Sequence, residues 1–182
     1  KEKLAGGMMT YGIPRFRLPR EVLENEIKPI ADSGVEIKTG VNIDSAELQR
    51  MTNEYDAVIV AAGTMLSRKL EVGGIVEGAY HYGLEFMNKY NNGEIKNLSG
   101  NVVIIGGGFT AVDCARSCAR VAKLLVGREG KVSIMYRRTE SFMAADMEEL
   151  EEITNEQIET RTLVTPVSVN YEDGSLKSVT FI

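Results

Sequence analysis

Four β-branched residues run directly into three glycines near the middle of this 182-residue chain. Val102–Ile105 predicts a buried parallel strand, and a helical pattern opens at Phe109, immediately after the glycines. A strand, a glycine turn and a helix N-terminus in this order form the arrangement that binds the phosphates of a dinucleotide. No other feature of the sequence constrains the fold as much.

Each part of this turn has a predicted role. Gly106 permits the tight turn, Gly108 lets the backbone approach a pyrophosphate, and Ala111 is small enough for close packing of helix against strand. The unpaired N–H groups and positive dipole end of the helix face the phosphates. The predicted contact residues of the turn are Gly106, Gly107, Gly108, Phe109, Thr110 and Ala111. The alternative is a structural glycine turn without a ligand, because this motif also occurs by chance.

An arginine pair ends the next predicted strand, Lys131–Tyr136. Arg137 and Arg138 stand where such sites place the residue that reads the adenosine ribose. An acidic residue there would bond the 2′-hydroxyl of NAD, whereas arginines hold the 2′-phosphate of NADP through forked, charge-assisted hydrogen bonds. The pair therefore favours NADP, with a solvated pair of surface charges as the alternative.

Composition excludes several other classes of protein. A content of 43% hydrophobic and 26% charged residues is that of an ordinary globular protein, and a net charge of −5 argues against a nucleic-acid surface. No apolar run reaches the roughly 20 residues of a membrane helix, and the N-terminus has no signal-peptide core. We therefore expect a cytoplasmic protein.

No metal site or catalytic acid–base group is expected. Cys114 and Cys118 are four residues apart on one helix face, which predicts buried packing, with a redox-sensitive thiol as the alternative. His81 has no patterned partners, and the acidic run from Asp146 to Glu152 is typical of a solvated helix face.

The remaining pattern predicts an α/β fold. The expected helices are Pro19–Ser33, Ser45–Met51, Leu84–Tyr90, Thr110–Leu125 and Asp146–Asn155. The further expected strands are Val35–Thr39, Ala57–Ala62, Glu159–Val164, and a hairpin of Val167–Tyr171 with Leu176–Phe181. The glycine-rich Gly6–Pro14 is expected to form no regular element, and Ser45 is expected to cap its helix.

Four segments together resemble one family. Gly6–Pro19, Tyr55–Thr64, Val102–Asp113 and Tyr136–Arg138 are similar, in this order, to the small (beta) subunit of NADPH-dependent glutamate synthase. The wider group of flavin-dependent pyridine-nucleotide oxidoreductases includes the electron-input domains of dihydropyrimidine dehydrogenase. The resemblance covers almost the whole chain, although common members carry Asn or Asp in place of Phe109.

The resemblance implies a Rossmann-like NAD(P)-binding domain, with a parallel sheet, helices and an antiparallel hairpin extension, behind a partial FAD-domain segment. The implied division is 1–64 for the FAD-domain segment, 65–96 for a connector and 97–182 for a C-terminally truncated NADPH domain. The chain would then be an internal fragment. The implied FAD-proximal residues are Gly7, Met8, Gly12, Ile13, Ala62 and Gly63.

The implied activity is hydride transfer from NADPH to FAD, with electrons passed onward and no side chain acting as acid or base. Iron–sulfur clusters would lie only in missing regions or partner subunits. The implied partners are the remainder of the flavoprotein chain and an iron–sulfur or large synthase subunit. A non-catalytic NAD(P)H-sensing or partner-docking module is the alternative, and a thioredoxin-reductase-like enzyme is disfavoured because the chain has no C-x-x-C pair.

Overall fold

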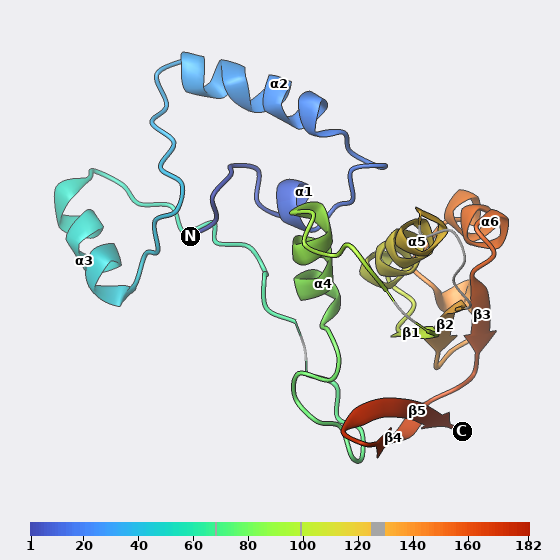
Figure 1. Cartoon of the computed structure of the whole chain (residues 1–182). Helices are drawn as coiled ribbons and strands as arrows, with labels where there is room; N and C mark the ends of the chain where they lie inside the picture. Colours follow the sequence, from blue (N-terminus) through green and yellow to red (C-terminus); the bar gives the residue numbers. More distant parts are fainter. Residues whose placement is uncertain (68, 99, 125–129) are drawn as a thin grey trace. The chain divides into compact units, whose positions relative to one another are not determined.

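The structure is a computed structural model that describes residues 1–67, 69–98, 100–124 and 130–182. The chain folds as two compact units, Lys1–Met65 and Leu66–Ile182. The first unit contains α1 (Met8–Tyr11), α2 (Arg20–Asp32) and α3 (Ser45–Glu54), and the second contains the sheet (Figure 1).

The long helix of the first unit forms as the sequence predicts. Apolar residues on one face of α2 follow the helical period, and Leu23 on that face is buried. The helix ends before Gly34, whose φ of +97° suits a glycine at this position. The expectation that Ser45 caps α3 is wrong by one residue. The helix is capped by Asp44, whose carboxylate accepts a hydrogen bond from the Glu47 amide at 2.9 Å.

Three further expectations for the first unit are wrong. The segment Gly6–Pro14 contains one helical turn, α1, because Gly7 adopts a φ of +53° and its carbonyl accepts hydrogen bonds from Thr10 and Tyr11. Neither Val35–Thr39 nor Ala57–Ala62 forms a strand. A strand is stable only when another strand accepts its backbone hydrogen bonds, and no described residue pairs with either segment.

The second unit is built on a parallel sheet of β1 (Val102–Ile105), β2 (Val132–Tyr136) and β3 (Glu159–Thr162), with β2 in the centre. The registers place Val102 beside Val132 and Ser133 beside Glu159. The crossover helices are α5 (Phe109–Leu124) and α6 (Met147–Asn155), which contact each other. The expected α/β fold with a parallel sheet is confirmed. The expectation that Val102–Ile105 is buried is wrong, because β1 lies at the edge of this sheet and Val103 and Ile105 are exposed. Leu125, at the end of the expected helix, lies outside the described residues.

The core of this unit lies between the sheet and its helices. Helix α4 (Gly83–Asn91) packs against α5, which also packs against β1, β2 and α6. Ile134 of β2 and Val112 of α5 are completely buried. The other buried core residues are Phe86, Met87, Cys114, Ala115, Cys118, Ala119, Val132, Met143, Ile153 and Ile158.

A hairpin of β4 (Pro166–Glu172) and β5 (Ser175–Phe181) follows the parallel sheet, as expected. Its turn uses Asp173 and Gly174, both with positive φ. The connecting segment before α4 lies along β4, where the Val169 amide donates to the Gly73 carbonyl at 2.9 Å. The hairpin is therefore held by residues far away in the sequence.

Candidate functional site

The turn after β1 brings the strand and α5 into close contact. Gly106 has a φ of +146°, and its amide donates to the Met135 carbonyl of β2 at 3.0 Å. A Cβ at Gly106 would lie 3.2 Å from the Cβ of Ala111. Both positions therefore require small residues, as predicted for the first and third positions of the motif.

The next two glycines have opposite surroundings. A Cβ at Gly107 would lie 2.5 Å from the ring of Tyr136, so this glycine is required by packing within the protein. A Cβ at Gly108 would meet no atom within 4 Å. The space in front of Gly108 is open, which is what the approach of a phosphate to the backbone requires.

The first turn of α5 presents backbone donors to this space. The amides of Ala111 and Val112 donate to the Gly108 carbonyl at 2.9 and 3.2 Å, whereas no carbonyl of the described backbone accepts from the amides of Phe109 and Thr110. Because α5 has 16 residues, its N-terminus carries the partial positive charge of a full helix dipole. An anion at this point would be stabilised by both effects.

The two arginines lie at the end of β2 with exposed side chains. A groove of about 1270 Å³ is lined by Arg137 together with Gly108, Phe109, Thr110 and Ala111. Arg138 does not line it, and its carbonyl accepts a hydrogen bond from the Leu163 amide at 3.2 Å. The structure thus brings Arg137, but not Arg138, to one groove with the glycine turn.

Both cysteines are buried in α5 and are among the residues that line this groove. The Cys114 thiol donates to the Gly83 carbonyl at 3.5 Å. Burial raises the pKa of Cys114, and it raises the pKa of Cys118 to about 12. Both side chains belong to the buried core, which confirms their predicted packing role.

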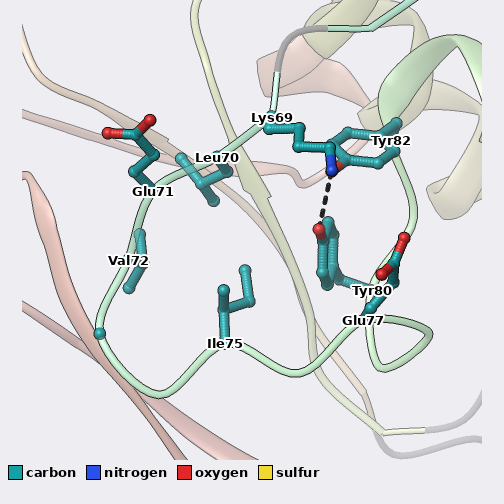
Figure 2. A pocket seen from close by; sticks show the side chains of 9 residues that line it. Lys69, Leu70, Glu71, Val72, Ile75, Glu77, Tyr80 and Tyr82 are labelled. Atoms are coloured by element: carbon teal, nitrogen blue, oxygen red, sulfur yellow. Dashed lines mark hydrogen bonds between the residues drawn. The ribbon is translucent and has the colours of Figure 1, made fainter.

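The segment before α4 contributes more to the cavities than its sequence suggests. Lys69, Tyr80 and Tyr82 line both the groove and a second cavity of about 520 Å³, shown in Figure 2. The hydroxyls of Tyr80 and Tyr82 lie 2.8 Å apart, and this hydrogen bond raises the pKa of Tyr80. In the sequence, the presence of two tyrosines in a glycine-rich stretch was the only indication of a cavity, and the segment was interpreted as a connector.

The residues expected near a flavin all lie in the first unit. Gly12 is required by local packing, because a Cβ would lie on the side chain of Met8. Cβ atoms at Gly7 and Gly63 would meet nothing within 4 Å, and both glycines have positive φ. Met8 and Ile13 are half-buried, and Ala62 is exposed. The two cavities described above are lined by residues of the second unit alone.

Within the described part of the chain, no group of three or more His, Cys, Asp or Glu residues is placed to hold a metal ion. The same part contains no helix that is both long and apolar enough to cross a membrane.

A family model described as pyridine nucleotide-disulphide oxidoreductase matches residues 4–181. The chain belongs to this family. It is 37% identical to the NADP(+)-dependent formate dehydrogenase subunit beta of Moorella thermoacetica, over 97% of this chain and 25% of that protein. It is 31% identical to the NADPH-Fe(3+) oxidoreductase subunit beta of Geobacter sulfurreducens, over 95% and 25%. The glutamate synthase [NADPH] small chain of Azospirillum brasilense is 30% identical, over 85% and 33%.

These comparisons confirm the family resemblance found in the motifs. The chain spans about a quarter to a third of the length of these curated relatives. A solved structure of Mycobacterium tuberculosis FprA in complex with NADPH is similar in fold, with a TM-score of 0.69 and 16% identity over 96% of this chain and 57% of that one. The three relatives are, by name, subunits or chains of larger enzymes.

Proposed function

We propose that this chain is the NADPH-binding part of a flavin-dependent oxidoreductase that passes hydride from NADPH to FAD and electrons onward. The observation that carries the proposal is the open space at Gly108, which faces the N-terminus of α5 and shares a groove with Arg137. The names of the relatives, which include NADP(+) and NADPH, support the choice of nucleotide.

The donor set fits a phosphorylated dinucleotide. The amides of Phe109 and Thr110 would bind the pyrophosphate, and the guanidinium of Arg137 would bind the 2′-phosphate by charge-assisted hydrogen bonds. Gly106, Gly107 and Ala111 keep this turn in the conformation that the contacts need. NADPH, when bound, supplies the hydride. The residues of this chain bind and orient it, and none is required as an acid or base.

The flavin belongs to the proposal for the whole protein only. We propose that Gly7, Met8, Gly12, Ile13, Ala62 and Gly63 lie near the flavin of the whole protein, and no step is assigned to them. The proposed division remains 1–64, 65–96 and 97–182, with the remainder of the flavoprotein chain and a further subunit as partners. Two buried free cysteines support a cytoplasmic location.

Substitution of the two arginines tests the proposed nucleotide. Loss of one charge-assisted hydrogen bond costs about 1.5–3 kcal/mol, or roughly ten- to a hundredfold in affinity. Arg137→Ala should therefore weaken NADPH binding by such a factor, measured by calorimetry, and change NADH binding little. Arg138→Ala, a matched charge removal outside the groove, should have a smaller effect. Equal NADPH affinity in the parent and both variants would make the arginines surface charges only.

Gly108→Val tests the site itself, because the new side chain would occupy the open space beside the turn. We expect it to abolish NADPH binding while circular dichroism shows an intact fold. An unchanged affinity would exclude this turn as the phosphate site. A sensing module would bind NADPH equally well, so rapid reduction of flavin by NADPH in the full-length protein separates the enzyme from that alternative.

A further inference from the structure

The second cavity, of about 520 Å³, lies inside the loop that runs from Lys69 to Tyr82 (Figure 2). It adjoins the groove, because both of these residues line the two spaces, but neither Gly108 nor Arg137 is among the described residues that line the cavity. A cavity of this volume is large enough to hold a small organic molecule. The proposed binding of NADPH makes no use of it.

The loop around the cavity is fixed by the hairpin. The Val169 amide of β4 donates to the Gly73 carbonyl at 2.9 Å, and the Val76 amide donates to the Tyr171 hydroxyl at 3.1 Å. Gly74 has a φ of +79°, and a Cβ there would lie 2.8 Å from the carbonyl oxygen of Val169. The loop backbone therefore packs directly on β4, so the cavity wall is formed without a ligand.

One part of the wall is polar. The amino group of Lys69 points toward the hydroxyls of Tyr80 and Tyr82, which are hydrogen-bonded to each other at 2.8 Å (Figure 2). Each hydroxyl has one proton, and this bond uses only one of the two, so one O–H is left to donate. Among the residues that the structure describes, no hydrogen bond or ion pair occupies this O–H or the Lys69 ammonium.

The rest of the wall is largely apolar. Leu70, Val72 and Ile75 line the cavity and are half-buried. The side chain of Glu71, which lies between two of them in sequence, points away from the centre of the loop (Figure 2). The cavity thus combines two hydrogen-bond donors, one of them charged, with a hydrocarbon surface.

Two charges of opposite sign act on the hydroxyl pair. The hydrogen bond to Tyr82 is the main cause of the raised pKa of Tyr80; the negative charge of Glu77 raises this pKa further, and the positive charge of Lys69 lowers it. Glu77 therefore opposes a second negative charge at this point. A ligand with a single negative charge suits the site better than a dianion.

We propose that this cavity binds a small amphipathic carboxylate, a molecule with one carboxylate group and an apolar body. The Lys69 ammonium and the remaining tyrosine O–H would each donate to one carboxylate oxygen, while Leu70, Val72 and Ile75 would contact the body. Two donors match the two oxygens of a carboxylate. A phosphate ester would instead bring a second negative charge toward Glu77. The inference goes beyond the proposed function, since none of these contacts involves the nucleotide.

The test uses hexanoate as the probe and titration calorimetry of the 182-residue chain. Hexanol, which lacks the charge, and hexyl phosphate, which has a second one, should each bind about tenfold more weakly than hexanoate. Lys69→Met keeps the length of the side chain but removes the ammonium, so it should weaken hexanoate binding about tenfold. Lys96→Met, the same change at an exposed lysine that lines neither space, should leave the affinity unchanged.

The tyrosines and glutamates make the test sharper. Each single Tyr→Phe variant retains one O–H, so only the double variant Tyr80→Phe, Tyr82→Phe should bind hexanoate more weakly, by about fivefold. Glu77→Gln should tighten binding about twofold, because it removes the repulsive charge. Glu71→Gln is the matched control, since this side chain points away from the cavity, and it should have a smaller effect.

NMR locates the bound probe. Nuclear Overhauser effects should connect the hexanoate methylene protons with the methyl groups of Leu70 and Ile75, which line the cavity. Effects to other parts of the chain alone would overturn the proposal. Absence of binding at about 10 mM hexanoate, equal affinity for hexanol, or equal affinity of the parent and Lys69→Met would overturn it as well.

Discussion

Two apolar segments of similar composition have different conformations in the two units. Ala57–Ala62 forms neither a helix nor a strand, and Ile59 is 89% exposed. Val102–Ile105 forms β1, paired in parallel with β2, whose Ile134 is fully buried. The residues alone do not separate these cases. The difference is that β1 has a neighbouring strand and a covering helix in its own unit.

The same contrast applies to charged residues. Arg50 in α3 bonds Glu47 and Glu54 on an exposed helix surface. Arg116 in α5 bonds Glu152 and Glu156 of the α6 region, and its side chain is only 8% exposed. The first set of contacts stabilises one helix locally, whereas the second joins two helices of the sheet unit. Tertiary contacts therefore concentrate in Leu66–Ile182.

The largest expected effect is from the buried strand. Ile134→Ala should lower the free energy of unfolding by about 4 kcal/mol, because it removes a side chain from a closed core. Ile59→Ala, the matched substitution in the other unit, should change it by less than about 0.5 kcal/mol. Urea unfolding followed by circular dichroism measures both. A large loss in Ile59→Ala would show that the first unit buries this segment in solution.

The next largest loss of stability is expected from a substitution of Arg116. Arg116→Ala would remove the bonds of a buried guanidinium to Glu152 and Glu156, while Glu156 keeps its bond to Arg120 at 2.6 Å, so we expect a cost of about 2 kcal/mol. Arg50→Ala should leave the unfolding midpoint unchanged, since its partners remain in water. Similar losses in the two variants would contradict the distinction between local and tertiary ion pairs. The Arg116 effect should also persist in salt, because buried pairs are screened less.

The structural features that could be predicted from the sequence are those that depend on residues adjacent in the chain. The succession of β1, the glycine turn and α5 was readable because a β-branched run, three glycines and a helical period are adjacent in the chain. The strand expected at Ala57–Ala62 was wrong because pairing depends on segments far away. The sequence placed both Arg137 and Arg138 beside the glycine turn. That only Arg137 lines the groove with Gly108 could not be predicted, since it depends on where the chain returns after β3.

Two neighbouring glycines of the turn in the second unit differ in what requires them: Gly107 is required by packing, and Gly108 by the proposed binding of a phosphate. Gly107→Ala should cost about 2 kcal/mol, because the added Cβ would overlap the ring of Tyr136, which is fixed by its hydrogen bond to Phe142. Gly108→Ala should leave the stability nearly unchanged, since nothing lies within 4 Å. Thermal unfolding of the two variants provides the measurement. Equal stabilities would show that the ring moves aside without cost.

The smallest expected effect is a pH dependence that reports on the second unit alone. Both cysteines lie in α5, and burial raises their pKa, to about 12 for Cys118. A thiol with a raised pKa in the folded state stabilises the fold below its unfolded pKa of about 8.5, and this contribution is lost as the pH rises. Between about pH 7.5 and 9 the free energy of unfolding should therefore fall by about 0.8 kcal/mol for each thiol, because the thiol ionises only in the unfolded chain.

A variant with Cys114→Ala and Cys118→Ala provides the control, since every other titrating group is retained. Its free energy of unfolding should fall less over the same pH range than that of the parent chain, as measured by urea titration at each pH. The first unit contains neither cysteine, so the difference between the two slopes belongs to the sheet unit. Identical slopes would mean that the thiols ionise equally in the folded and unfolded chains, and the burial of α5 against the core would then have to be revised.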